Sequence, residues 1–433
     1  MLKRFLKINI YLLGISLFTF LPGHVLAQKN NADTLHLTVT NAEEIFLKKN
    51  LVLLANQYNV DINKALLLQA KVWDNPVLNT DQNLYDGKFF RHTTTNGIQY
   101  GQIYLQVQQL IRTSKKIRKL TQLAQDNVLS SAAQFNDVMR NLKFVLTTDF
   151  NNLSQLQNMA SVYKNEMQIM QNLVNGMNEM YKIGDISLKE NIRIKALLFS
   201  LQSDVVDNFK QQIDIQKEVA SLLQLEEGNW VVAEASQSIS ENQIKDLQIL
   251  SLQDSALKNR PDIEYVNTQA NFQKDNIIYQ KALAKPDVTL GIEYDKLSSY
   301  TPNLFGLSAS VPLTIFNKNK GNITAAQLSY KQAGIIVQQV KSQVSKDVQG
   351  AWLKLMNAST MLNTENKTLQ DNYETLFKNM IISYRQREVN LIEFIDFFDA
   401  YKDIRTKQAQ QIANQRNAVA ELNFTTNKNI IKL

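Results

Sequence analysis

Few side chains in this sequence are of a type or in a pattern that supports catalysis. The chain has no cysteine, which excludes disulfides, thiolate metal sites and a cysteine nucleophile. Its only histidines are His24, His36 and His92, and none has neighbours spaced as a catalytic triad or a metal-ligand cluster. A glycine-rich phosphate loop is also absent. The sequence therefore predicts a protein that is not an enzyme, with no catalytic residue, no metal site and no cofactor.

Two further groups of side chains could carry chemistry of another kind. Ten methionines suggest thioether ligands for copper or silver, but Met167, Met170 and Met177 fall on one seam of a helix, where packing is their ordinary role. Glu393 and Asp396 stand three residues apart and so share one helical face, which Asp399 continues. What these carboxylates do depends on the elements that position them.

The N-terminus has the pattern of an export signal. A basic start, an apolar run and the small-x-small sequence Val25-Leu26-Ala27 predict a signal peptide over 1–27, with an uncleaved signal anchor as the alternative. The missing cysteine excludes lipidation of the mature N-terminus. Removal of the signal lowers the formal charge from +7 to +4, because Lys3, Arg4 and Lys7 leave. This mild positive charge does not indicate a nucleic-acid partner.

The mature chain reads as a tandem duplication. The segment 46–54 resembles 256–264 at an offset of about 210 residues, and "YKIGDISLKENI" resembles "YRQREVNLIEFI" at an offset of about 203. The second match aligns Tyr181 with Tyr384 and Glu190 with Glu393. We therefore divide the chain into a first repeat over 28–224, a connecting segment over 225–253 and a second repeat over 254–433. The connecting segment, with 35–39 and the C-terminal tail, could form a collar around the middle.

Each repeat has the same predicted order of elements, which is helix, β-hairpin, very long helix and returning helix. The predicted helices are at about 41–73, 113–182 and 187–224, and again at about 252–284, 318–386 and 390–426. One long helix carries apolar residues alternately three and four apart, as in a coiled coil: Leu153, Leu156, Ala160, Tyr163, Met167, Met170, Val174 and Met177. The second long helix has a similar pattern, with leucines seven residues apart: Leu355, Leu362, Leu369 and Leu376.

The predicted hairpins lie at about 76–110 and 286–316. Their best strands alternate apolar and polar residues, so that one face is apolar. The predicted outward-facing residues are Val288, Leu290, Ile292, Phe305, Leu307, Val311 and Leu313. Strands of about ten residues with this pattern suit a membrane barrel with lipid outside and water inside. Four strands cannot close a barrel, but three chains would supply twelve. A sheet packed on a soluble core remains the alternative.

Three stretches resemble the outer-membrane efflux protein family, the TolC-like outer-membrane factors. They are "LTVTNAEEIFLKKNLVLLANQ", "LKNRPDIEYVNTQ" with Arg260-Pro261-Asp262, and "GLSASVPLTIFNKNKGNITAAQLSY" with Val311-Pro312-Leu313. The resemblance implies a mainly α protein with a β-barrel: a homotrimeric, twelve-stranded barrel in outer-membrane lipid of a Gram-negative bacterium, continued by an α-helical coiled-coil tunnel across the periplasm. Such a duct serves tripartite efflux or type I secretion. It docks on a periplasmic adaptor (membrane fusion) protein and an inner-membrane pump of the RND or ABC type.

The resemblance also assigns roles to the turns between the paired helices. It implies a periplasmic gate at Glu393 and Asp396, with Asp399 a weaker candidate, because three chains would turn each acid into a ring of carboxylates. It places adaptor contacts at the two turns, with candidates Gly184, Asp185, Ser187, Arg387, Glu388 and Asn390. Arg387 stands where the family often has glycine, which puts the shape of the second turn in question.

Two alternatives stay open on the residues alone. The acidic face at Glu393 could be an ordinary solvated helix surface. The whole chain could be an exported coiled-coil scaffold or adhesin without channel activity. The cargo of a duct is not encoded in such features.

Overall fold

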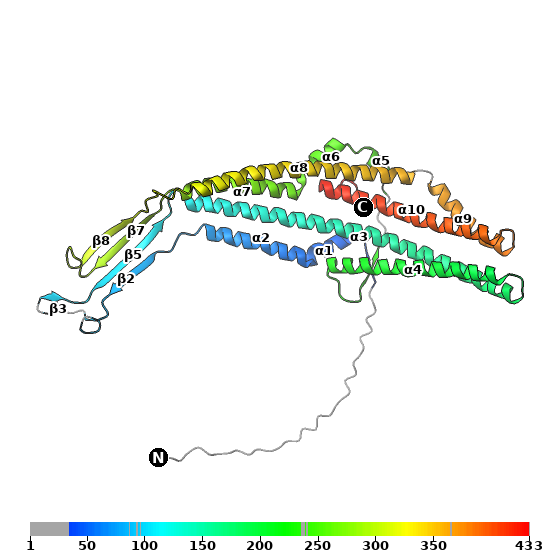
Figure 1. Cartoon of the computed structure of the whole chain (residues 1–433), viewed down its shortest axis with the longest axis horizontal. Coiled ribbons are helices and arrows are strands. Elements are labelled where there is room, and N and C mark those ends of the chain that lie inside the picture. The colour runs from blue at the N-terminus through cyan, green and yellow to red at the C-terminus, as the bar shows by residue number, and fades with distance from the viewer. Residues whose placement is uncertain are drawn as a thin grey trace, which may run out of the picture.

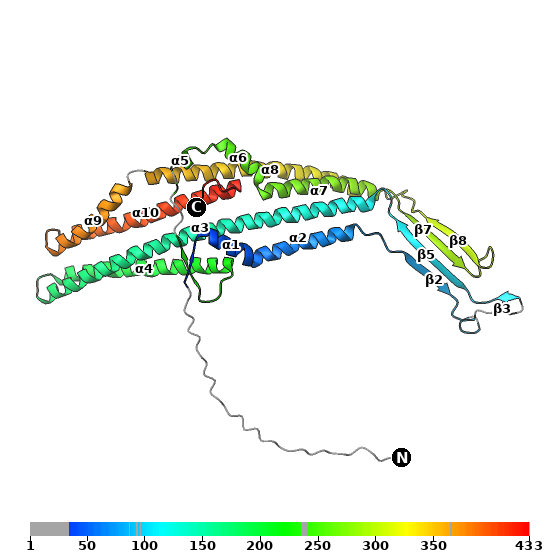
Figure 2. The ribbon, with the colours of Figure 1, turned by 180° about the vertical axis from the view of Figure 1, so that it is seen from behind.

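A computed structural model describes residues 34–85, 87–91, 94–95, 97–234, 239, 241–363 and 366–432. The predicted signal peptide over 1–27, His24 and His92 lie outside the described residues. The described part is long and narrow, with helices side by side along its length and the strands at one end (Figures 1 and 2). None of the described helices is long and apolar enough to cross a membrane.

The strands form one curved four-stranded antiparallel sheet in the order β2-β5-β7-β8. Its strands are β2 (Val77–Gln82), β5 (Ile103–Ile111), β7 (Val288–Asp295) and β8 (Leu304–Ser310). Each hairpin thus contributes two neighbouring strands, and β5 pairs with β7 where the repeats meet. The first hairpin also carries a small ladder of β3 (Thr94–Thr95) with β4 (Ile98–Gln99). Both β2 and β8 are left with an unpaired edge within the described chain.

Next to the sheet, four helices lie side by side in a corresponding order (Figure 1). Helix α2 (Leu51–Ala70) packs on α3 (Lys116–Lys182), α3 on α7 (Pro261–Leu283), and α7 on α8 (Lys320–Asn363). At a rise of 1.5 Å per residue, α3 alone is about 100 Å long. Helices α2 and α8 form the two edges of this layer, and the repeats again meet in its middle, at α3 and α7.

The other half of the molecule consists of two helix pairs. Helix α3 packs on α4 (Leu188–Leu223), and α9 (Asn366–Arg385) packs on α10 (Leu391–Thr426). The seam predicted on α3 faces their common apolar core, which contains Met159, Tyr163, Met170, Leu173, Val174, Met177, Ile194, Leu198, Leu201, Phe377, Ile381, Tyr384, Phe394, Phe398 and Tyr401. The seam methionines therefore pack in a core.

The leading helix of each repeat differs from its prediction as one continuous helix. The segment at 41–73 forms α1 (Val39–Lys49) and α2, which part at Asn50, and the second repeat forms α6 (Ile249–Asn259) and α7, which part at Arg260. Both residues are extended, with ψ of 119° and 128°. The Asn50 side chain accepts a hydrogen bond from Leu53 N–H and donates one to the carbonyl of Leu222, so it caps α2 and ties it to α4.

One other predicted element is corrected, and another is interrupted by residues outside the described part. The last strand was expected to reach 316 but ends at Ser310, so Val311 and Leu313 lie beyond β8. Pro312 explains this, because proline has no N–H to extend the ladder. The long helix expected over 318–386 is described as α8 and α9, on either side of residues 364 and 365, which fall outside the described part.

A small collar lies halfway along the helices. Strand β1 (Thr34–Leu37) pairs in parallel with β6 (Trp230–Ala233), and the short helix α5 (Glu241–Lys245) places Ile244 in one core cluster with Ile431 near the C-terminus. Gln216 anchors β6 by bonding both the N–H and the carbonyl of Val231, at 3.0 and 2.6 Å. Trp230 stacks on Phe209 of α4 and acts as a packing anchor.

Candidate functional site

The two turns that join the helix pairs have the same backbone conformation. At the first, Gly184 has φ of +76°, its N–H bonds the carbonyl of Tyr181, and Asp185 N–H bonds that of Met180. At the second, Arg387 has φ of +62°, with equivalent bonds from its own N–H to Tyr384 and from Glu388 N–H to Ser383. Both are Schellman-type helix ends, which normally favour glycine at the left-handed position. Arg387 therefore does not change the shape of the turn.

The returning helices are capped in equivalent ways. Ser187 accepts a hydrogen bond from Glu190 N–H at 3.2 Å, and Asn390 accepts one from Glu393 N–H at 3.0 Å. Both caps have an acid three residues later, which also suits the positive end of the helix dipole. Two of the predicted adaptor-contact residues, Ser187 and Asn390, therefore act as the N-caps of α4 and α10.

Arg387 joins the two turns. Its guanidinium Nη2 lies 2.7 Å from the Asp185 carboxylate and also donates to the Asp185 backbone carbonyl. A glycine at this position would make neither contact. Both side chains are about half exposed, so the ion pair itself contributes little free energy, on the order of 0–1 kcal/mol. It adds a polar contact between the turns of the two repeats.

Two substitutions separate the Arg387–Asp185 contact (the tie) from the strain of the left-handed backbone at Arg387. Arg387→Gly removes the tie but suits the left-handed backbone, whereas Arg387→Ala removes the tie and keeps the strain. We expect Arg387→Ala to unfold with a free energy about 1 kcal/mol below that of Arg387→Gly. Thermal unfolding of the two purified variants measures this. Equal stability of the two variants would contradict the strained conformation.

A hydrogen bond between the repeats was missed by the sequence reasoning. The Tyr384 hydroxyl at the end of α9 donates to Glu190 Oε1 at the start of α4, at 3.0 Å. Tyr384 also stacks on Phe394, at 4.7 Å between ring centroids. Burial and the neighbouring Glu190 carboxylate raise the pKa of Tyr384, so the phenol stays protonated as the donor. Only the duplication hinted at this pair, because it aligns Tyr and Glu in both repeats.

The predicted gate acids lie on the exposed face of α10. Glu393, Asp396 and Asp399 point away from Phe394 and Phe398, which are buried in the core between the helix pairs. The structure therefore places the three acids on one face, as their spacing predicts.

The sheet has one polar and one apolar face. On the polar face, Glu293 accepts hydrogen bonds from Tyr104 at 2.9 Å and Gln106 at 2.7 Å, and Gln106 also bonds Ser308. Glycine makes room for this network, because a Cβ at Gly306 would come within 2.9 Å of the Glu293 carboxylate. The network therefore holds three strands together from one side.

The opposite face contains five of the seven predicted outward-facing residues. Ile292 lies opposite Leu307, and Leu290 and Phe305 follow on the same face, with Val288 at its end. Four of them are exposed, Leu307 to 88%, and Val288 is half-buried. No other described part of the chain covers this face, so it presents a contiguous apolar surface.

Comparisons with known proteins agree with this architecture. No family profile matches the sequence, and no curated protein matches it either. Among solved structures, the fold resembles that of CusC, for which transmembrane channel formation is described, with a TM-score of 0.71, 15% identity, and coverage of 90% of this chain and 91% of that one. It also resembles the outer-membrane channel CmeC of Campylobacter jejuni, with a TM-score of 0.72, 12% identity, and coverage of 90% and 86%.

A third similar structure is the outer-membrane protein VceC of Vibrio cholerae, with a TM-score of 0.69, 14% identity, and coverage of 91% and 97%. All three proteins are matched over 86% to 97% of their own length, and about 90% of this chain is covered each time. The chain therefore has the fold of the TolC-like outer-membrane channels, the family that its sequence motifs resemble.

Proposed function

We propose that three copies of this chain form a channel in the outer membrane of a Gram-negative bacterium, which serves as the exit duct of a tripartite efflux or type I secretion system. The observation that supports this most strongly is the pair of open edges. One chain presents a sheet with unpaired edges at β2 and β8, next to a helical layer with edges at α2 and α8.

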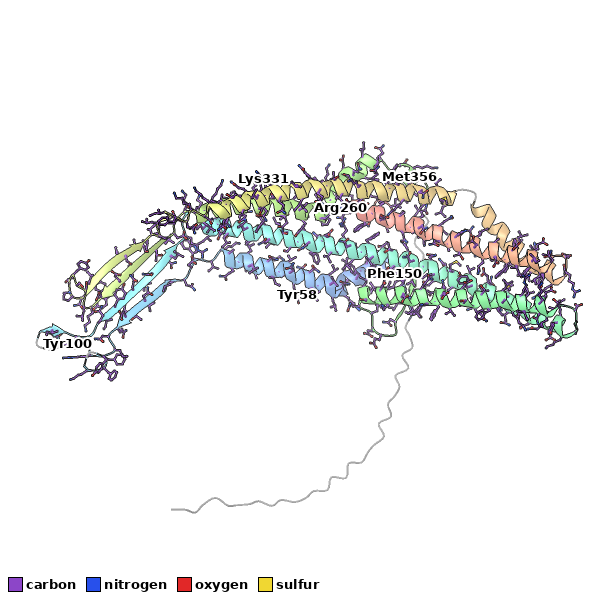
Figure 3. The ribbon with its side chains drawn as sticks, viewed as in Figure 1. Tyr58, Tyr100, Phe150, Arg260, Lys331 and Met356 are labelled. Atoms are coloured by element: carbon purple, nitrogen blue, oxygen red, sulfur yellow. The ribbon has the colours of Figure 1, made fainter. Side chains whose placement is uncertain are left out.

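The two edges of the helical layer are apolar. Helix α2 exposes a stripe with a spacing of three to four residues: Leu51, Leu54, Tyr58, Ile62 and Leu66. Helix α8 exposes Leu328, Ile335 and Ile336. Tyr58 and Lys331 mark these opposite edges in Figure 3. If copies join head to tail, the α8 edge of one covers the α2 edge of the next, and β8 pairs with β2 of the next in the antiparallel sense.

Head-to-tail joining produces a closed ring when the rotation closes. Ring closure also removes the sheet edges, which lipid cannot satisfy with hydrogen bonds. In this arrangement the apolar face with Leu307 and Ile292 contacts lipid, and the polar face with Glu293 and Gln106 lines a water-filled lumen. The helices continue the lumen into the periplasm, where the turns at Gly184 and Arg387 meet the adaptor and the inner-membrane pump.

The gate is assigned to Glu393 and Asp396 at the far end of the helices, with Asp399 as a further acid on the same face. In a trimer these acids form rings of carboxylates, which attract cations and bind divalent ions. The proposed channel is not an enzyme.

Removal of both gate acids should change conduction. We expect Glu393→Ala/Asp396→Ala to increase single-channel conductance in planar bilayers, by about twofold or more, and to weaken cation preference and block by divalent ions. The matched control is Glu226→Ala/Glu227→Ala, which removes two exposed acids from the connecting segment. Currents that match the unmodified channel would exclude these acids from the gate.

The alternative function, an exported coiled-coil scaffold or adhesin, is distinguished by fractionation. A duct should sediment with the outer membrane and require detergent, whereas a scaffold should be released by salt. Recovery of a monomer in buffer would refute the channel proposal.

A further inference from the structure

The Tyr384–Glu190 hydrogen bond lies at the junction of the two repeats. It joins the end of α9 in the second repeat to the start of α4 in the first. Tyr384 is only 4% exposed, so this contact belongs to the packed interface between the helix pairs. Its geometry follows from the two turns, because Tyr384 is three residues before the left-handed residue Arg387, and Glu190 is three residues after the cap Ser187.

The duplication supplies the same two side chains a second time. Tyr181 ends α3 at the position equivalent to Tyr384, and Glu393 begins α10 at the position equivalent to Glu190. The turns around them have matching hydrogen bonds and caps. Within the described part of one chain, however, Tyr181 is 39% exposed and neither its hydroxyl nor the Glu393 carboxylate has a hydrogen-bond partner. One chain therefore satisfies only half of a duplicated pair.

The second cross-turn contact is not duplicated. The positions equivalent to Arg387 and Asp185 hold Gly184 and Glu388, so that ion pair cannot form again elsewhere. The Tyr–Glu pair thus differs from its neighbour, because both of its side-chain types recur at the right positions.

A head-to-tail assembly would place Tyr181 and Glu393 at a junction between copies that resembles the junction between the repeats of one chain. In one chain the first repeat is followed by the second, through β5–β7 and α3–α7. In a ring the second repeat of one copy is followed by the first repeat of the next copy, so each junction between copies resembles the junction within a chain. We propose that Tyr181 of one copy donates a hydrogen bond to Glu393 of the adjoining copy. This inference rests on the proposed trimeric duct.

The contact changes the expected roles of the gate acids. Three bonds within chains and three between chains would alternate around the ring of tips. The Glu393 carboxylate would be held at the wall by the phenol of the next copy, as Glu190 is held by Tyr384. Asp396, one turn farther along α10, would then be the acid that projects freely into the lumen. The proposal therefore names two side chains of the contact between copies, Tyr181 and Glu393.

Thiol crosslinking tests the contact directly, because the chain has no cysteine of its own. The test variant is Tyr181→Cys/Glu393→Cys, expressed in the outer membrane and treated with a short thiol-to-thiol crosslinker. The matched variant Glu190→Cys/Tyr384→Cys has the same geometry within one chain, and so calibrates the reach of the reagent. Each single cysteine variant reports crosslinking of a residue to itself across the three-fold axis.

We expect the Tyr181/Glu393 variant to give covalent dimers and trimers on denaturing gels, and the Glu190/Tyr384 variant to give only a monomer with altered mobility. Light scattering of the detergent-purified proteins gives the number of chains independently. A trimer in which the in-chain pair reacts but the Tyr181/Glu393 pair does not would overturn this contact and leave the duct intact. A monomer would overturn both proposals.

Discussion

Replacing Arg260 by alanine is expected to lower the free energy of unfolding by about 2–3 kcal/mol, because it removes a buried guanidinium and its contacts with two partly buried carboxylates. The Arg260 side chain is 6% exposed and lies where α6 ends against α7 and α8 (Figure 3). Its guanidinium makes a two-pronged bond with Asp262, at 3.0 and 2.6 Å, and a third contact with Asp347 at 3.2 Å. Burial alone would raise the pKa of Asp262, yet Arg260 holds it below its usual range.

Two further variants separate the effect of this site from that of an ordinary ion pair. Arg260→Lys keeps the charge but loses the planar fork, and should recover only part of the stability. Lys354→Ala breaks a pair with Glu421 in which the lysine is exposed, and should cost less than about 1 kcal/mol. Denaturant unfolding in detergent measures all three. An Arg260→Ala loss no larger than that of Lys354→Ala would contradict the role of the buried guanidinium.

The second large effect is expected at Glu166, a carboxylate in the middle of α3. Glu166 is 1% exposed, and neither of its oxygens has a hydrogen-bond partner among the described residues. Burial raises its pKa from 4.5 to about 7, although the charges of Arg405 and Lys402 oppose the shift. The folded chain therefore holds this proton more tightly than the unfolded chain does.

The sign of the pH dependence follows from that difference. The contribution of Glu166 to stability is fully present below pH 4.5, falls as the pH rises, and is lost above pH 7, where the buried group must ionise. Glu166→Gln, which stays neutral, should raise the free energy of unfolding by about 3 kcal/mol at pH 8. Near pH 4 it should change little.

Unfolding measured across this pH range tests the prediction, with Glu179→Gln as the control. Glu179 is also on α3 but is exposed and paired with Lys182, so its substitution controls for the loss of a surface carboxylate from the same helix. A difference between Glu166→Gln and the unmodified chain that does not vary with pH would contradict an ionisation at this site.

Much of this architecture could be predicted because the repeating patterns extend over many residues. The seam on α3 and the alternation on β7 and β8 both give the right face of their elements, since each depends only on the period of the backbone. The breaks at Asn50 and Arg260 could not be read from periodicity, because the apolar pattern continues across them. Local signals were present at both: Asn50 is a favourable helix cap, and Pro261 suits the first position of a helix.

The contacts between the tips could not be predicted from one sequence. The Tyr384–Glu190 bond joins residues far apart in the chain, and its existence depends on how the two helix pairs converge. Arg387 shows the opposite case, because its identity departs from the usual glycine while its backbone keeps the glycine conformation. The arginine at position 387 therefore did not predict the shape of the turn, but it did indicate an additional contact, the one with Asp185.

The tie between Arg387 and Asp185 has a consequence for the mechanics of the proposed ring. Of six junctions between repeats, the three within chains would carry this tie, and the three between chains would have Gly184 and Glu388 in its place. The ring of turns would then alternate between junctions with this additional contact and junctions without it. When the ring of turns widens, the junctions between chains should separate first. Each chain would then move outward as one unit, and the opening would keep its three-fold symmetry.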